Sequence, residues 1–180
     1  MNFEQNVCKQ IPHLRRYAQS LTNDSVAAED LVQDCLERAL RKRLLWRRSG
    51  NVRAWLFRML YRIFLNHRSS AATRREVSST NPGEDLHVTA DHDAQLLCRD
   101  AASAIERLPV EQRAALMLIV LENPSYEEAA DILGIKVGTL RSRLSRAREF
   151  VREYCQPADR APRTASAVSG SEGAMLRRVK

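Results

Sequence analysis

Glycine, proline and long apolar runs are scarce in this sequence, and their scarcity narrows the choice of fold. Six glycines and six prolines in 180 residues, with few β-branched runs, favour helices over sheet. No apolar run approaches the roughly 20 residues that a membrane span requires. The first residues lack the basic and then apolar design of a secretion signal. We therefore expect an all-helical protein that stays in the cytoplasm.

Residue patterns that carry catalysis or bind metal are also missing. The cysteines are scattered, without a C-x-x-C pair or a histidine at ligand spacing, and we interpret them as reduced, partly buried thiols rather than as a redox or zinc site. They are Cys8, Cys35, Cys98 and Cys155. The histidines are isolated, and no glycine cradle, pair of catalytic carboxylates or nucleophile–base motif accompanies them. An enzyme is the least favoured class, and we expect no cofactor and no metal.

Charge is unevenly distributed along the chain. The 29 Lys and Arg against 22 Asp and Glu give a net charge of +7 and a pI near 9.7, which suggests a polyanionic partner. Residues 41–75 hold eleven Lys or Arg and no acid, whereas residues 76–93 hold five acids and no Lys or Arg.

These changes of charge coincide with the expected domain limits. The acidic stretch is rich in Ser, Thr, Asn, Pro and Gly and lacks helical periodicity, so residues 76–95 are predicted to be a flexible linker. Residues 156–180 are mostly Ala, Ser, Arg and Pro, which predicts a disordered tail. Two small helical domains remain, over residues 1–75 and 96–155.

Three helices are expected in the first domain. Apolar residues recur every three or four positions from Val7 to Leu21, the stripe of an amphipathic helix. A second stripe follows from about Ala28, after an N-cap at Asp24 or Ser25, and the opposite face of that helix is acidic. A third helix is expected from about Val52 to Arg68.

The second domain carries clear helix boundaries. Leu108-Pro109 precedes one helix and Asn123-Pro124 stops it. Ser125 and Glu128 have the S-x-x-E spacing of a capping box, and Gly134 is expected to end the short helix in the left-handed conformation. The last helix begins near Val137, with Leu140, Leu144, Ala147 and Val151 facing inward. A short helix, a turn with Gly and a second helix form a helix-turn-helix.

The exposed face of the last helix suits DNA. Arg pairs with guanine edges, Ser and Thr are tolerant readers, and each can hold a phosphate. The first turn of such a helix reaches deepest into the major groove. The predicted DNA contacts are Gly138, Thr139, Arg141, Ser142, Ser145 and Arg146. A solvated basic face on a structural helix is the alternative.

The acid-free basic segment suggests a second DNA surface. It holds five of the ten aromatic residues of the chain, and exposed aromatic faces stack on unpaired bases. Trp55 and Phe64 lie on the apolar face and are expected in the core. The candidates for single-stranded or opening DNA are Trp46, Phe57, Arg58, Tyr61 and Arg62. A core role for the aromatics is the alternative.

The acidic face of the second helix is too negative to touch DNA. Beside a DNA-binding segment, it is a candidate protein-docking surface whose charge sets orientation and encounter rate. A solvated helix face is the alternative.

Three stretches together resemble the extracytoplasmic-function group of bacterial sigma factors. They are AAEDLVQDCLERAL (27–40), NVRAWLFRMLYRIFLNHR (51–68) and LPVEQRAALMLIVLENPSYEEAADILGIKVGTLRSRLSRARE (108–149). They occur in the order of the family and cover most of both predicted domains. A helix-turn-helix alone would be a weak signal, whereas the three together are specific.

The resemblance implies that the chain binds RNA polymerase core and directs it to promoters. It assigns Asp30, Gln33 and Asp34 to core contact, the third helix and its preceding loop to the −10 element, and the helix-turn-helix to the −35 element. The acidic linker resembles the interdomain connector of the family. An anti-sigma factor that clamps both domains is a further implied partner.

The sequence departs from the family at two positions, and two alternatives stay open. Many members have Asn where this chain has Arg62, and since Arg cannot accept a hydrogen bond, the usual base preference need not hold. Lys136 stands where a better cap or Pro is common. One alternative is an ordinary helix-turn-helix regulator that acts without polymerase. The other is a sigma-like decoy that binds an anti-sigma factor, against which Arg141 and Arg146 argue.

Overall fold

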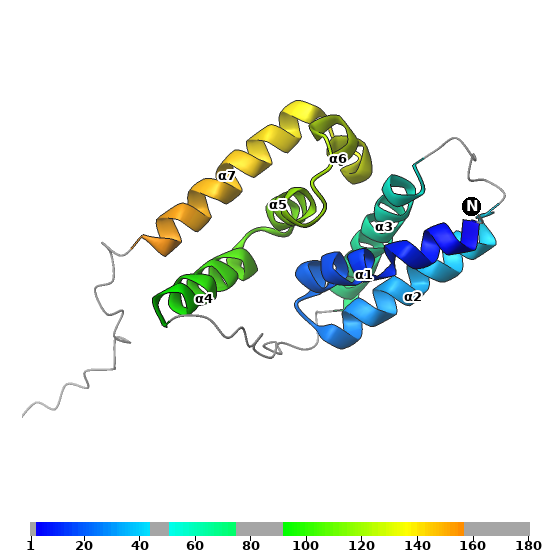
Figure 1. Cartoon of the computed structure of the whole chain (residues 1–180), viewed down its shortest axis with the longest axis horizontal. Helices are drawn as coiled ribbons and strands as arrows, with labels where there is room; N and C mark the ends of the chain where they lie inside the picture. The colour runs from blue at the N-terminus through cyan, green and yellow to red at the C-terminus, as the bar shows by residue number, and fades with distance from the viewer. Residues whose placement is uncertain (1–2, 44–50, 75–91, 157–180) are drawn as a thin grey trace, which may run out of the picture.

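The computed structural model describes residues 3–43, 51–74 and 92–156, and its regular elements there are all α-helices (Figure 1). This confirms the all-helical fold. The predicted disordered tail lies outside the described residues, except for its first residue. Most of the predicted linker lies outside them too, but its last four residues belong to a helix that begins at His92.

The first three helices form a unit, here called the first unit. They are α1 (Phe3–Thr22), α2 (Ser25–Arg41) and α3 (Val52–Arg74). Both α1 and α3 pack against α2. The N-cap of α2 is Asp24, whose Oδ1 accepts hydrogen bonds from the backbone N–H groups of Val26 and Ala27 at 2.8 and 3.0 Å. The predicted cap is confirmed, whereas α3 continues six residues beyond the expected end at Arg68.

The other four helices form the second unit. They are α4 (His92–Arg107), α5 (Val110–Glu122), α6 (Tyr126–Leu133) and α7 (Val137–Cys155). Asn123 and Gly134 end α5 and α6 in the left-handed conformation, at φ +46° and +66°. Both helix stops were predicted at these places, and α6–α7 is the expected helix-turn-helix.

The capping box at the start of α6 is only half formed. The Ser125 hydroxyl accepts a hydrogen bond from the N–H of Glu128 at 3.0 Å, as predicted. The Glu128 carboxylate does not complete the box, because it accepts a hydrogen bond from Asn51 Nδ2 of the first unit at 2.6 Å. Glu128, which was expected to cap its own helix, therefore links the two units instead.

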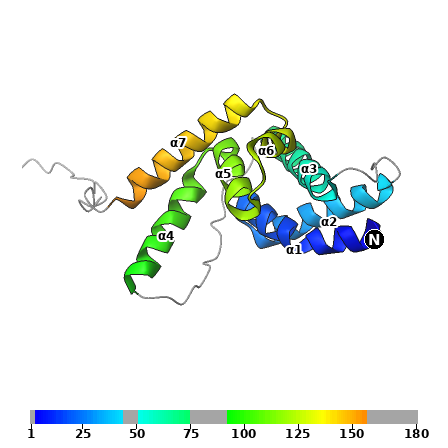
Figure 2. The same ribbon diagram turned by 45° about the horizontal axis from the view of Figure 1, so that its top comes forward.

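The two units pack directly against each other. Helix α5 lies on α1, and α6 lies on α3 (Figure 2). The buried apolar residues form one cluster that continues through both units, although the sequence indicated two separate domains. The buried hydroxyl of Tyr17 in α1 donates a hydrogen bond to the carbonyl of Ala114 in α5 at 3.1 Å. Burial raises the pKa of Tyr17 well above its usual value.

A buried arginine ties three helices together. From α5, Arg113 donates through Nη2 to the carbonyl of Leu21 at 2.9 Å and through Nη1 to the carbonyl of Glu106 at 3.1 Å. These carbonyls lie in the last turns of α1 and α4, where helical carbonyls have no partner within their own helix. The guanidinium also places positive charge at the negative ends of two helix dipoles.

None of the described helices is both long and apolar enough to cross a membrane.

Candidate nucleic-acid and protein interfaces

Helix α7 buries one face and presents the other to solvent. Leu140, Leu144 and Ala147 are buried, as their spacing predicted. All six predicted DNA contacts on this helix are exposed: Gly138, Thr139, Arg141, Ser142, Ser145 and Arg146. Nothing lies within 4 Å of the place where a Cβ of Gly138 would stand, so the start of the helix is open to a close-approaching ligand. The N-cap of α7 is Lys136, whose side chain makes no capping hydrogen bond.

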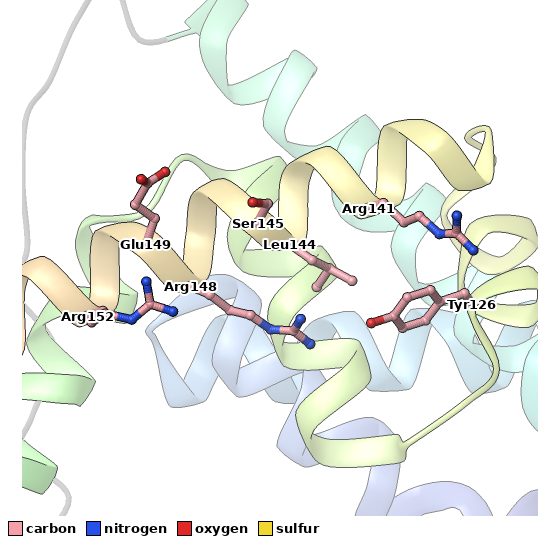
Figure 3. Close-up of a pocket in the computed structure, with 7 residues that line it drawn as sticks. All are labelled: Tyr126, Arg141, Leu144, Ser145, Arg148, Glu149 and Arg152. Carbon is pink, nitrogen blue, oxygen red and sulfur yellow. The ribbon is translucent and has the colours of Figure 1, made fainter.

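A basic groove continues this surface along α7. A cavity of about 420 Å³ lies between α7 and the start of α6 (Figure 3). Its lining residues are Tyr126, Arg141, Leu144, Ser145, Arg148, Glu149 and Arg152. The Arg141 guanidinium carbon lies 6.0 Å from the centre of the Tyr126 ring, at the outer limit of a cation–π contact. Three guanidinium groups against one carboxylate favour an anionic ligand, and arginine pairs bidentately with phosphate.

Sequence reasoning missed part of this groove. Tyr126 was not expected at the DNA-binding surface. Arg148 was expected on the exposed face of the helix and Arg152 as an extension of its arginine run, although neither was among the predicted contacts. No sequence signal pointed to Tyr126, because the start of its short helix was analysed only for its capping residues. The structure brings it alongside Arg141 because α6 and α7 pack across the Gly134 turn.

The aromatic surface expected on α3 is not exposed. Phe57 is 1% exposed and Tyr61 is 3% exposed. Phe57 packs on Tyr17 of α1, with ring centroids 5.4 Å apart. Burial raises the pKa of Tyr61, and the positive charge of Arg143 from α7 is close enough to oppose that rise. The expectation that both rings face solvent is wrong for this arrangement, because core packing and the second unit cover them.

The remaining predicted −10 residues differ in environment. Arg58 forms a salt bridge with Asp131 of α6. Arg62 is exposed and has no ion pair within the described part of the chain. Trp46 lies outside the described residues. Of the aromatics expected in the core, Phe64 is buried and Trp55 is half-buried against Phe3, with ring centroids 6.2 Å apart.

The predicted polymerase-binding residues lie on α2. Asp30 and Gln33 are exposed, on the side opposite the buried Leu31, Val32 and Cys35. Asp34 is half-buried, and its Oδ2 lies 3.1 Å from Nε2 of His67 in α3. The three side chains therefore do not share one environment. Asp30 and Gln33 are exposed and can contact a partner without rearrangement, whereas the Asp34 carboxylate contacts His67 of α3.

A buried carboxylate joins the two units. Glu122, in the last turn of α5, has a side chain only 2% exposed. It forms a salt bridge with Arg53 of α3, and its Oε2 lies 3.0 Å from Nδ1 of His13 in α1. Arg16 of α1 approaches Oε1 at 3.6 Å. No local pattern signals these pairs, since their members lie 69 to 109 positions apart in the sequence.

The described cysteines are free thiols in three different environments. Cys8 is exposed, Cys155 is half-buried and Cys35 is buried. Burial raises the pKa of Cys35 to about 12, and its thiol donates to the carbonyl of Leu56 at 3.5 Å. Within the residues that the structure describes, no three His, Cys, Asp or Glu side chains are placed to hold a metal ion.

Comparisons with known proteins match both parts of the chain. Residues 7–61 match the family model of the sigma2 domain of PhyR, and residues 98–151 match that of sigma-70 region 4. The chain is 36% identical over 138 residues to the ECF RNA polymerase sigma factor EcfG of Rhodopseudomonas palustris, covering 77% of this chain and 76% of that protein. It is 34% identical over 147 residues to the ECF RNA polymerase sigma factor SigM of Mycobacterium tuberculosis, covering 81% and 73%.

Solved structures show the same architecture. The sigma factor RpoE of Bartonella quintana, in complex with the anti-sigma factor NepR, is 33% identical and superposes with a TM-score of 0.68 over 84% of this chain and 95% of that one. The PhyRSL–NepR complex from Sphingomonas sp. Fr1 gives a TM-score of 0.63 over 95% of this chain and 100% of that one. At 22% identity, that second likeness concerns the fold alone.

Proposed function

The chain belongs to the extracytoplasmic-function sigma factors of bacterial RNA polymerase, and we propose that its helices α7 and α3 bind promoter DNA and that its helix α2 binds polymerase core. The observation that carries the proposal is the face of α7, where arginines, serines and an open glycine stand clear of the core. Such a face fits the major groove, which an α-helix enters with its first turns. The chain acts in this proposal as an initiation factor in the cytoplasm, and not as an enzyme.

Two parts of the α7 surface have different tasks. Arg141, Ser142 and Arg146 lie on its exposed face and read the edges of the −35 bases. Arg148 and Arg152, further along the groove, hold the phosphate backbone and fix the register of the helix on the duplex. Loss of a base-reading arginine relaxes sequence preference, whereas loss of a phosphate-binding one weakens binding to every sequence alike.

Helices α3 and α2 complete the proposal. The basic face of α3, with Arg58 and Arg62, receives the −10 DNA strand. Tyr61 reaches it only if the second unit moves, whereas Phe57 packs on Tyr17 within the first unit. Asp30, Gln33 and Asp34 on α2 contact polymerase core, for which an acidic face gives orientation and a fast encounter. Since the similar RpoE is bound by the anti-sigma factor NepR, an anti-sigma factor is also a proposed partner of this chain.

The test of the base-reading role is promoter-specific transcription by the double variant R141A/R146A. Each bidentate Arg–guanine pair contributes about 1–3 kcal/mol of discrimination, so transcription from the preferred promoter should fall at least tenfold. Co-purification with core should stay unchanged, because α2 is untouched. The matched control is R99A, which removes an exposed arginine from α4. Unchanged promoter selectivity in R141A/R146A would contradict the assignment.

The core-binding role is tested separately with D30N/D34N. This variant should lose co-purification with core while its α7 surface still binds duplex DNA. Normal co-purification would exclude α2 as the docking face. If the wild-type chain binds duplex DNA and never core, the ordinary regulator is the better description, and if it binds an anti-sigma factor alone, the decoy is.

A further inference from the structure

Tyr126 and Arg141 meet at one end of the basic groove. Tyr126 is the first residue of α6, and Arg141 lies in the second turn of α7, across the turn at Gly134. The Arg141 guanidinium carbon lies 6.0 Å from the centre of the Tyr126 ring. Figure 3 shows the Tyr126 side chain between the ends of Arg141 and Arg148, with its hydroxyl directed toward Arg148. The ring is therefore the part of Tyr126 that contacts Arg141.

The tyrosine ring is the fixed member of this pair. Tyr126 is half-buried and packs against the hydrophobic core. Its helix is held at that end by a cap, since the Ser125 hydroxyl accepts a hydrogen bond from the N–H of Glu128 at 3.0 Å. Arg141 is exposed and has no ion pair among the residues that the structure describes. The ring therefore determines where the guanidinium group lies, rather than the reverse.

An aromatic face holds an arginine without using its hydrogen-bond donors. The guanidinium group has five N–H donors in a planar fork, and a carboxylate partner occupies two of them in a bidentate pair. Contact with a ring face leaves the edge of the fork free. The carboxylate that lines the groove belongs to Glu149, eight positions further along α7, which is about 12 Å along the helix axis. Arg141 is thus held by a contact that is compatible with base pairing.

The orientation of Arg141 before DNA binds matters for base reading. A free arginine side chain samples many rotamers, and binding has to restrict them. Bidentate pairing with guanine needs two N–H groups of the fork at O6 and N7 at once. Arg141 follows Gly138 by one turn on the exposed face of α7, in the part of such a helix that enters the major groove. An arginine held in one orientation discriminates between base pairs better than a mobile one, which adapts to other acceptors.

We propose that Tyr126 is a positioning residue for promoter recognition, whose ring orients Arg141 toward one base pair of the −35 element. The proposal rests on the proposed base-reading function of α7. Tyr126 acts through Arg141 and contacts no base edge itself, so it sharpens the preference only at the position that Arg141 reads. Helix α6 thereby takes part in sequence discrimination, in addition to supporting α7.

The experiment measures base preference at each position of the −35 element. Core polymerase with the full chain transcribes the preferred promoter and templates in which each −35 base pair is changed in turn. The preference is the ratio of transcript from the original template to transcript from the changed one. Both come from the same protein preparation, so a loss of folded protein lowers both alike and leaves the ratio unchanged. The variant R141A identifies the position that Arg141 reads, because the preference falls there.

Three substitutions separate the ring from its packing and from its hydroxyl. Y126L keeps an apolar side chain against the core and removes the ring. Y126F keeps the ring and removes the hydroxyl. The matched control is Y154L, because Tyr154 in the last turn of α7 also lies under an arginine, with the guanidinium carbon of Arg107 at 5.3 Å from the ring centre.

Y126L should lower the preference about twofold to fivefold at the Arg141 position alone, the range for a cation–π contact at an exposed site. Y126F and Y154L should match the wild-type chain at every position. Adding Y126L to R141A should change nothing further, because the two residues act as one pair. An unchanged preference in Y126L, or an equal loss in Y126F, would overturn the role of the ring. A loss in R141A/Y126L beyond that in R141A would overturn its action through Arg141.

A failure of the proposed function gives a different result. If R141A leaves the preference unchanged at every position, Arg141 reads no base, and its proposed function and the positioning role fail together. If R141A lowers the preference at one position and Y126L does not, the function stands and the positioning role alone is wrong. If Y126L lowers the preference at every position alike, Tyr126 supports the whole of α7, which also overturns the positioning role.

Discussion

Replacing Arg113 by methionine should destabilise the whole chain, because this one side chain serves helices of both units. Its guanidinium donates to the carbonyls of Leu21 and Glu106 at 2.9 and 3.1 Å, and both carbonyls lie at helix ends without a partner of their own. Methionine fills a similar volume and offers no donor.

The expected loss in the free energy of unfolding follows from the two hydrogen bonds that are lost and from the desolvation cost of the guanidinium that is removed. A hydrogen bond to a charged group contributes about 1.5–3 kcal/mol, so two bonds are worth about 3–6 kcal/mol before correction. The buried guanidinium also carries a desolvation cost, seen in the lowered pKa of Arg113 and in an Nε that has no partner in the described part of the chain. Removing that cost leaves an expected net loss of about 2–4 kcal/mol.

Urea unfolding followed by circular dichroism measures this loss, with Tm as a second readout. A loss of about 3 kcal/mol corresponds to about 6–12 °C in Tm for a chain of this size. R113K should lose roughly half as much, because lysine lacks the planar fork that reaches two carbonyls. R99M, at an exposed position of α4, serves as the control. A loss below about 0.5 kcal/mol in R113M would refute the reasoning, since that is the range of ordinary surface changes.

Three other predictions concern thiols, alkaline pH and a helix cap. Cys8 should react with a thiol reagent at pH 8 long before Cys35, because burial raises the pKa of the Cys35 thiol to about 12; equal rates by mass-spectrometric mapping would contradict its burial. The free energy of unfolding should fall above about pH 10, because the raised pKa values of Tyr17 and Tyr61 mean that the unfolded chain releases these protons first. The stability contributed by their burial is thus fully present below pH 10 and is lost as pH rises toward the folded values; urea midpoints at pH 8 and 11 measure it, and Y17F should reduce the slope. D24A should cost about 1 kcal/mol in urea unfolding, because it removes both bonds to the first turn of α2, whereas a cost near zero would show that the cap is dispensable.

Local features of the fold were predictable because short-range chemistry determines them. The caps at Asp24, Ser125 and Gly134 depend on residues within four positions, so they can be predicted directly from the sequence. The same holds for the face of α7, where the spacing of Leu140 and Leu144 alone decides which residues are exposed. The six predicted α7 contacts therefore all lie on the solvent side, although their role in DNA binding stays a prediction.

The packing of the units could not be predicted, because it depends on pairs far apart in the chain. Arg58 and Asp131 are separated by 73 positions, and neither carries a local sign of the other. The exposure of Tyr61 was misjudged for the same reason, because an amphipathic pattern shows which face of a helix is apolar and does not show that a second unit covers the other face. Phe57 was misjudged for a different reason, since it packs on Tyr17 within the first unit. The basic segment was recognised, whereas the carboxylates that cover it were not.

The most direct test of the central claim is run-off transcription with purified polymerase core on a library of promoter fragments, with and without this chain. The account predicts specific new transcripts that require the chain, that disappear with R141A/R146A and that persist with R99A. Tight binding to core without any chain-dependent transcript, or binding to duplex DNA with no effect on core, would contradict it.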